Sequence, residues 1–495
     1  MITRSFLIFA FSISLYSCIP KNISKKHAHQ KFSTKELQQD FVVLKNILEK
    51  KHPSIYWYTS KDSMDLYFNQ YYQGIKNDMS EKEFVWTILS PLINKIHCGH
   101  TSVSMSKRAE KNINKDTTHY FPFHLKIWND TMAVTAFLTK DHPYIHRGTI
   151  IKSIDGFTTS EIKNKIFDCI PQDGYEQIAS YLRVSFDFPY YYNNVFGSNK
   201  QYNIEYIDSL GKINRAIVNA FCVSNDSAKK EQPINALKDK SKRKANLRLN
   251  RSFTMDSTLE YATIILNTFS TGNLRHFFRQ SFKKLNKYHI PNLIIDIRLN
   301  GGGRVNASTL LTKYISRINF KVADSVYAQS NTVRPFSKYF KSSLLNNIEL
   351  KFIAKKKNDN YYHLSLFEKK IYQPKKKYHY EGKVFVLMGG PTFSASCLFV
   401  NAIKGQKDIS LLGEQTGGGS YGNSGIVIPS LILPNTKIAV RMPFFKVIQH
   451  SHINEKGFGI VPDVYIGTSY EAIKNGYDKK MSVAKEMIIS ESKKH

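Results

Sequence analysis

The segment 384–405, VFVLMGGPTFSASCLFVNAIKG, places Ser394 where a hydrophobic strand ends and a helix begins. Serine is a common helix N-cap, because its hydroxyl accepts hydrogen bonds from the free N–H groups of the first helical turn. The same N–H groups can instead face a reacting oxygen, with the Ser394 hydroxyl beside them as a nucleophile. This segment alone favours capping and leaves nucleophilic chemistry open.

A run of three glycines, Gly301 to Gly303, follows the strand-like sequence NLIIDIRLN. Neither the Lys-Ser/Thr pair of a phosphate loop nor a dinucleotide-binding spacing accompanies it, so we do not expect a phosphate cradle. Glycines at a strand end allow a sharp turn and bring backbone N–H groups close to a ligand, as an oxyanion site requires. A tight turn in which Asp296 pairs with Arg298 for purely structural reasons explains the same residues.

A histidine lies at a predicted helix-to-strand junction far upstream. Ser80 and Glu83 form a capping box that predicts a helix ending near Gly99, and a strand is expected from Thr101. His100 therefore lies at a junction, where side chains often face a cleft. An imidazole that is neutral near physiological pH can take a proton from a serine and return it to a leaving group.

The elements around these residues change character along the chain. A capping box at Ser33 and Glu36 opens an amphipathic helix, short alternating strands with an Asp155-Gly156 turn follow, and strands alternate with helices in the last part. This order predicts a helical region, a small β-rich module, a charged linker and a mainly parallel α/β domain, with residues 338–380 inserted over its core. The expected boundaries are 33–117, 118–223, 224–252 and 253–480.

The first residues predict export. Arg4 precedes the apolar run SFLIFAFSISLYS, which is too short to span a membrane and has the length of a signal-peptide core. The run ends in LYSC, which resembles a bacterial lipobox, so we expect a signal peptide at 1–17, lipidation of Cys18 and a tether at 18–32. A plain signal peptide and an uncleaved anchor are the alternatives. The expected location is the bacterial cell envelope, lipid-anchored and either periplasmic or surface-exposed.

The composition limits the other partners. The 495-residue chain carries a formal net charge of +32, but its lysines are scattered and no basic stretch contains the interleaved aromatic residues of a nucleic-acid platform. We therefore expect no nucleic acid and interpret the charge as a lysine-rich solvated surface compatible with anionic lipid. The remaining cysteines are far apart and predict no disulfide framework. They are Cys98, Cys169, Cys222 and Cys397.

Five segments in chain order, GHTSV, DIRLNGGG, TFSAS, LLGEQTGGG and GFGIVPDV, together resemble the C-terminal processing (tail-specific) serine peptidase family. The resemblance extends over residues 34–466. It implies an α/β fold with a ClpP/crotonase-like peptidase core, preceded by an N-terminal helical region and a PDZ-like β-rich module. The stretch RGTIIKSIDG is similar to the best-kept part of such a module, whereas the usual carboxylate-binding loop is not recognisable, so the module is degenerate.

The family pattern places the nucleophile at Ser394 and the oxyanion hole at the backbone N–H groups of Ala395 and Gly303. Members with a Ser/Lys dyad carry lysine after a GxxTxG turn, where this chain has Gly419. Members similar to the tricorn core and the chlamydial protease instead use a histidine from a GH or DxH stretch near the N-terminus, which His100 matches. The resemblance therefore implies a Ser/His mechanism.

The family also implies an acid that holds the histidine, in the segment before GxxPD. Glu455 in INEKGFGIVPD is the nearest candidate, one residue off the pattern, and Glu414 is the reserve. Many relatives carry aspartate two residues before the histidine, where this chain has Cys98. These departures leave a loss of catalysis open.

The sequence thus predicts an exported lipoprotein serine endopeptidase that acts on peptides or unfolded proteins and requires no metal or organic cofactor. A catalytically inactive peptide-binding lipoprotein of the same fold is the alternative, and an esterase that uses the same serine is a third. Zinc held by HCGH and by the histidines of 450–452 is a weaker alternative, since loop histidines on a basic surface explain both stretches better. The oligomeric state is left open.

Overall fold

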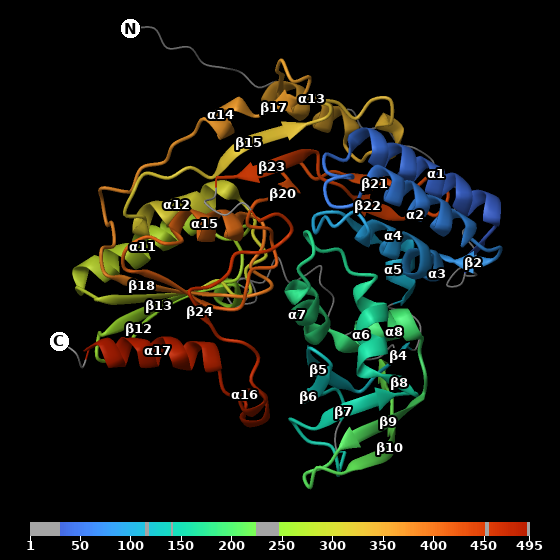
Figure 1. Cartoon of the computed structure of the whole chain (residues 1–495), viewed down its shortest axis with the longest axis horizontal. Helices are drawn as coiled ribbons and strands as arrows, with labels where there is room; N and C mark the ends of the chain where they lie inside the picture. The colour runs from blue at the N-terminus through green and yellow to red at the C-terminus, as the bar shows by residue number, and fades with distance from the viewer. Residues whose placement is uncertain (1–29, 114–117, 140–141, 224–246, 451–454, 493–495) are drawn as a thin grey trace, which may run out of the picture.

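The computed structural model describes residues 30–113, 118–139, 142–223, 247–450 and 455–492. The expected signal peptide, Cys18, most of the expected tether and most of the expected linker lie outside these residues. Figure 1 shows three regions: N-terminal helices, a module with its own sheet, and a C-terminal part that contains the largest layered structure. Within the described ranges, no helix is both long enough and apolar enough to cross a membrane.

The N-terminal region is helical, and both predicted capping boxes are confirmed. The Ser33 hydroxyl accepts from the backbone N–H of Glu36, whose carboxylate accepts from Ser33 in return, and Ser80 and Glu83 repeat the arrangement. His100 lies in the loop between α4 and the short strand β3. The elements are β1 (Lys31–Phe32), α1 (Thr34–Lys51), α2 (Lys61–Gln73), β2 (Met79–Ser80), α3 (Glu81–Glu83), the π-helical turn η1 (Phe84–Leu89), α4 (Ser90–Asn94), β3 (Ser102–Ser104) and α5 (Lys107–Ile113).

The middle module is a sheet of order β10-β9-β7-β6-β5, with helices packed around one apolar core. The predicted Asp155-Gly156 turn joins β7 to β8, and both residues have positive φ, 51° and 84°. A separate pair, β4 (Thr118–Tyr120) with β11 (Phe221–Val223), brings the two ends of the module together. The remaining elements are β5 (Phe123–Trp128), β6 (Thr131–Phe137), β7 (Ile150–Ile154), β8 (Phe157–Thr158), α6 (Thr159–Phe167), α7 (Ile178–Phe186), α8 (Phe188–Phe196), β9 (Gln201–Ile207) and β10 (Ile213–Asn219).

The C-terminal part contains a six-stranded sheet of order β12-β13-β14-β18-β19-β24, parallel except for β12. Alternate residues of its strands face opposite layers: Leu293 and Ile295 pack with α11, α12 and α15, whereas Ile294 packs with α17 (Figure 1). This confirms the predicted parallel α/β core. Its elements are β12 (Arg251–Met255), β13 (Tyr261–Leu266), α11 (Leu274–Lys287), β14 (Asn292–Asp296), α12 (Val305–Ile315), β18 (Lys383–Met388), α15 (Ala395–Ile403), β19 (Ile409–Gly413), β24 (Val464–Tyr465), α16 (Tyr470–Asn475) and α17 (Lys479–Ser492).

Two smaller sheets complete the C-terminal part. One has the order β16-β17-β15-β23-β20 and includes strands from the expected insertion 338–380, and the other joins β21 and β22 to β3. The N-terminal strand that follows His100 is thus paired with a hairpin near the end of the chain. The elements are β15 (Ala323–Ala328), η2 (Ser337–Tyr339), α13 (Ser343–Ile353), β16 (Lys355–Lys356), β17 (Tyr362–His363), α14 (Ser365–Glu368), β20 (Gly422–Gly425), β21 (Ser430–Ile432), β22 (Ala439–Arg441) and β23 (Phe445–Gln449).

A buried carboxylate fastens the N-terminal helices to this hairpin. Asp40 of α1 is fully buried, and its carboxylate accepts from the backbone N–H groups of Asn435 and Thr436, at 2.8 Å each, and from the Thr436 hydroxyl at 2.6 Å. Residues 433–438 form the turn between β21 and β22. One side chain therefore satisfies three donors of a turn almost 400 positions away in the sequence.

Replacing Asp40 by alanine leaves these three donors without a partner in a buried place, so we expect Asp40→Ala to lower the free energy of unfolding by about 3 kcal/mol. The midpoint of guanidinium denaturation, followed by tryptophan fluorescence, measures this change. Asp62→Ala, at an exposed position of α2, serves as the control and should change stability by less than about 0.5 kcal/mol. Equal stability of the two variants would contradict this role for Asp40.

Candidate active site

Ser394 stands at the N-terminal end of α15, but it does not cap the helix. Its backbone has φ 56° and ψ −120°, a conformation that non-glycine residues rarely adopt, and its side chain makes no capping hydrogen bond. The hydroxyl oxygen instead lies 3.0 Å from Nε2 of His100. The structure therefore contradicts the capping interpretation of this serine and brings together the two residues that the sequence proposed as nucleophile and base.

The strained turn is held by the glycine run of the neighbouring strand. Asn300 accepts from the N–H of Gly302 through its side chain and from the N–H of Phe393 through its carbonyl. Gly302 has φ 95°, and a Cβ there would lie 2.7 Å from the Phe393 carbonyl and 2.8 Å from the Ser394 Cβ. Only glycine permits this approach. Thr392 adds a hydrogen bond from its hydroxyl to the carbonyl of Ile297.

Two backbone N–H groups in the cavity that contains Ser394 have no hydrogen-bond acceptor among the described residues. They belong to Ala395, the first residue of α15, and to Gly303, whose neighbours Gly302 and Arg304 pair with Phe269 instead. Both residues line the same cavity of about 690 Å³ as Ser394 and His100. Free donors next to a hydroxyl and an imidazole are the arrangement that stabilises a developing oxyanion.

The His100 ring is packed tightly but is only half hydrogen-bonded. It lies against the ring of Phe393, with centroids 4.7 Å apart, and its Nδ1 atom is buried with no hydrogen-bond partner among the described residues. Burial, together with the positive charge of Arg441, lowers the pKa of His100 to about 4. The ring is therefore neutral at physiological pH and able to accept a proton.

The loop that carries His100 is held by Asp173, a residue that sequence reasoning missed. Its Oδ1 accepts from the backbone N–H of Gly99 at 2.7 Å, and its neighbour Gly174 exchanges hydrogen bonds with His97. Burial raises the pKa of Asp173 to about 7. Since Cys98 stands where many relatives were expected to carry aspartate, this chain holds the loop with a carboxylate from a distant segment. Nothing in the stretch PQDGY distinguishes this aspartate.

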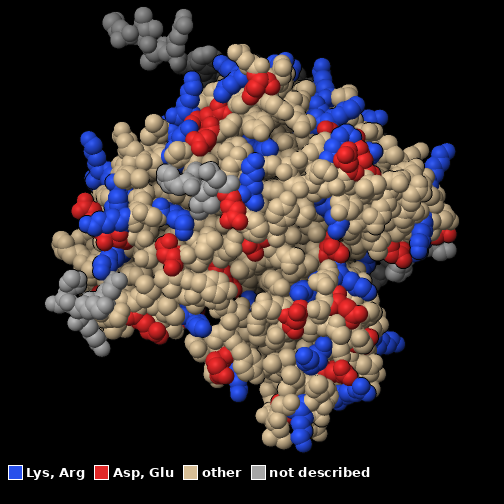
Figure 2. Space-filling model, in the orientation of Figure 1, with Lys and Arg blue, Asp and Glu red and all other residues tan. Residues whose placement is uncertain are grey.

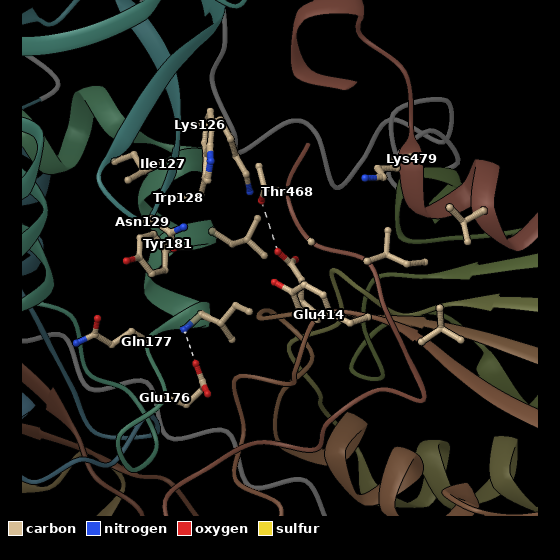
Figure 3. A pocket seen from close by; sticks show the side chains of 17 residues that line it. Lys126, Ile127, Trp128, Asn129, Glu176, Gln177, Tyr181, Glu414, Thr468 and Lys479 are labelled. Carbon is tan, nitrogen blue, oxygen red and sulfur yellow. Dashed lines mark hydrogen bonds between the residues drawn. The ribbon is translucent and has the colours of Figure 1, made fainter. Parts of the chain in front are cut away.

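Neither glutamate considered as the partner of His100 reaches it. Glu455 is exposed, and its backbone carbonyl accepts from the Ser420 hydroxyl. Glu414 is buried and pairs with Lys480 at 2.6 Å in a different hollow, lined by the module and the core, where Thr468 also donates to it (Figure 3). The structure therefore does not join either carboxylate to the imidazole.

The other sequence features have structural partners. Asp296 and Arg298 form an ion pair, which Asp478 extends. His97 is bonded to Gly174, and His450 is bonded to Asp324. His452 lies outside the described residues, and within these no group of three histidine, cysteine or acidic side chains gathers as metal ligands would. The four described cysteines are free thiols, as expected.

The wall of the cavity combines apolar and polar side chains and carries one permanent charge. Among the described residues that line it, only Arg441 has a side chain charged at every physiological pH. Arg441 of β22 pairs with Ser102 of β3, and Ser102 follows His100 by two residues. The aliphatic and aromatic lining comes from several elements, including Val305, Phe367, Leu398, Ile426 and Val427.

Comparison with known proteins identifies a family for the C-terminal part of the chain. Residues 260–466 match the model of Peptidase family S41, whereas no curated protein matches the chain significantly. Among solved structures, mature CPAF is similar at 13% identity and a TM-score of 0.61, over 89% of this chain and 94% of that one. Mature CPAF complexed with lactacystin gives 12% identity and a TM-score of 0.62, over 92% and 98%.

These two likenesses establish the shared fold over almost the whole described chain. The matched segment 260–466 contains the glycine run, the Ser394 turn and β19 with the glycine turn that follows it. Residues 260–466 of this chain therefore match Peptidase family S41, and the chain shares its fold with mature CPAF.

Proposed function

We propose that this protein is an exported lipoprotein that hydrolyses peptide bonds by a Ser/His mechanism. The observation that carries the proposal is the 3.0 Å contact between the Ser394 hydroxyl and His100 Nε2, on a turn whose serine makes no capping bond. A serine held in a strained conformation against an imidazole is hard to explain by stability alone, because strain of this kind costs about 1 to 3 kcal/mol.

The proposed reaction begins when Ser394 Oγ attacks the carbonyl carbon of a peptide bond and its proton passes to His100 Nε2. The carbonyl oxygen becomes negatively charged and accepts hydrogen bonds from the N–H groups of Ala395 and Gly303. His100 then gives the proton to the leaving amine, and water hydrolyses the acyl-enzyme by the reverse sequence of proton transfers.

One observation favours the alternative, a peptide-binding protein without efficient catalysis. To accept a proton at Nε2, the neutral His100 ring must carry its own proton on Nδ1, which is buried without a hydrogen-bond partner among the described residues. The imidazolium that forms during the reaction is therefore poorly stabilised, in line with the lowered pKa of His100. His100 is then a weak base, and the negative charge of the nearby oxyanion must stabilise the imidazolium that forms.

The lining of the cavity indicates the class of substrate. Val305 and Leu398 provide apolar surface beside Ser394, and Arg441 provides a guanidinium for which the described residues show no ion pair. A peptide with an apolar side chain at the scissile bond and a carboxylate nearby matches both features. Unfolded proteins supply such segments, whereas folded ones rarely expose them.

Labelling by a fluorophosphonate probe tests the nucleophile and the base. We expect the wild-type protein to be labelled and Ser394→Ala to be unlabelled. His100→Ala should react about 100-fold more slowly than the wild type, because general-base assistance is lost. Ser396→Ala is the matched control, since the Ser396 hydroxyl is buried without a partner and only two positions away. Wild-type protein that is folded but unlabelled would favour the peptide-binding alternative.

The pH dependence of the same labelling tests the role of Arg441. A base with a pKa of about 4 is deprotonated above that pH, so the labelling rate should rise through pH 4 and stay constant from about pH 5 to neutral. Arg441→Gln removes a charge that disfavours the imidazolium, so the pKa of His100 should rise and the acid limb should move to higher pH. Circular dichroism at each pH checks the fold. An acid limb at the same pH in both proteins would refute the coupling.

Lipidation at Cys18 is tested by membrane partitioning in the producing cell. We expect Cys18→Ser to move the protein from the membrane fraction to the soluble fraction, because the acyl chains hold the mature protein on the bilayer. Cys222→Ser, which changes an exposed free thiol within the described residues, is the control and should leave partitioning unchanged. If the Cys18→Ser variant stays in the membrane fraction and has the same chain length as the wild-type protein, the protein is not anchored through this residue.

A further inference from the structure

The helix α13, within the segment 338–380, presents large apolar side chains to solvent. Leu344, Leu345, Ile348 and Phe352 are 71%, 67%, 58% and 86% exposed. At about 100° of rotation per residue, these four positions fall within one stripe of roughly 100° on the helix surface. Helices of globular proteins usually bury such a stripe in the core, whereas α13 exposes it to solvent.

The outward orientation of the stripe is fixed by the opposite face of the helix. Leu350 is fully buried there, and Asn347 accepts, at 2.8 Å each, from the Thr332 hydroxyl and the backbone N–H of Val333. Rotation of α13 to bury the stripe would break these contacts. Figure 1 shows α13 at the upper edge of the molecule, beside β17. The contacts of Leu350 and Asn347 therefore hold α13 with its apolar stripe facing solvent.

The segment that contains the stripe is rich in lysine, and four of its lysines lie on α13 or next to its ends. Residues 338–380 contain eleven lysines and only three acidic residues. Lys341 precedes the helix, Lys351 lies within it, and Lys355 and Lys356 follow it in β16; all four are exposed and form no ion pair with another described residue. Figure 2 shows basic and acidic side chains interspersed over this face of the molecule, its upper edge included.

We propose that α13 docks on the surface of an anionic phospholipid bilayer. The apolar stripe enters the boundary between headgroups and acyl chains, while the surrounding lysines contact lipid phosphates. A second copy of the chain fits the stripe less well, because a symmetric contact would bring the two sets of lysines together. This docking is a second attachment beside the proposed lipid anchor, and it requires no catalysis.

Vesicle sedimentation tests the docking without the anchor. The mature chain that begins at residue 18 is used with Cys18→Ser, so that it carries no acyl chain. We expect it to bind vesicles of phosphatidylcholine with phosphatidylglycerol at least 10-fold better than vesicles of phosphatidylcholine alone, and to dissociate as salt is raised.

Two sets of variants separate the apolar and the charged contributions. Leu344→Ser with Phe352→Ser should reduce binding to anionic vesicles at least 10-fold, whereas Leu66→Ser should not, although Leu66 on α2 is 70% exposed. Lys355→Gln with Lys356→Gln should reduce binding to anionic vesicles and weaken its salt dependence.

Two outcomes would overturn the proposal. One is folded protein that does not bind anionic vesicles, or that binds them equally well after Leu344 and Phe352 are replaced. The other is a stable dimer in light scattering that the Leu344→Ser, Phe352→Ser variant abolishes, because the stripe would then belong to a second copy. Fluorophosphonate labelling of the same variants is independent, so a failure of the peptidase proposal is distinguishable from a failure of this one.

Discussion

The hydrogen bond between Ser394 and His100 joins residues 294 positions apart, and three regions of the chain must fit together for it to exist. The core supplies the strained serine, and the N-terminal region supplies the imidazole from the loop just before β3, the strand that pairs with the β21–β22 hairpin. The module supplies Asp173, which holds the loop next to the imidazole. Because catalytic groups tolerate displacements of well under 1 Å, the packing between these regions bears directly on the chemistry.

Desolvation decides which groups at this site can react. Burial away from solvent lowers the pKa of His100 to about 4 and raises that of Asp173 to about 7. The same effect raises the pKa of Cys397, three residues after Ser394, to about 12, so its thiol is inert although it lies in the first turn of a helix. Ser394 is then the nucleophile of this turn that both faces the cavity and contacts a base.

Local sequence features were enough to predict the local structure. The capping boxes at Ser33 and Ser80, the Asp155-Gly156 turn and the strand-glycine-helix pattern each depend on neighbouring residues, and each appears where expected. The candidate pair of Ser394 and His100 was reached through a family resemblance. The residues around this pair were not predicted. Asp173 and Arg441 are brought to the site by contacts between distant segments, and such contacts leave no periodic pattern in the sequence.

The failures follow the same division. Glu455 was proposed from its distance along the chain to a family motif, and the structure places its side chain on the surface. The core was expected to end at residue 480, but α17 continues to Ser492 and covers one face of the sheet. The expected insertion contributes β16 and β17 to a sheet, because its short strands find partners in β15 rather than in each other alone.

The pairing of β3 with β22 also sets the order in which the molecule becomes complete. His100 is synthesised early. The strand Ala439–Arg441, which pairs with β3 after the His100 loop, and the turn that is hydrogen-bonded to Asp40 are synthesised much later. A growing chain therefore contains the serine and the histidine before their contact can form. The contact between Ser394 and His100 therefore forms only after nearly the whole polypeptide has been made and has folded.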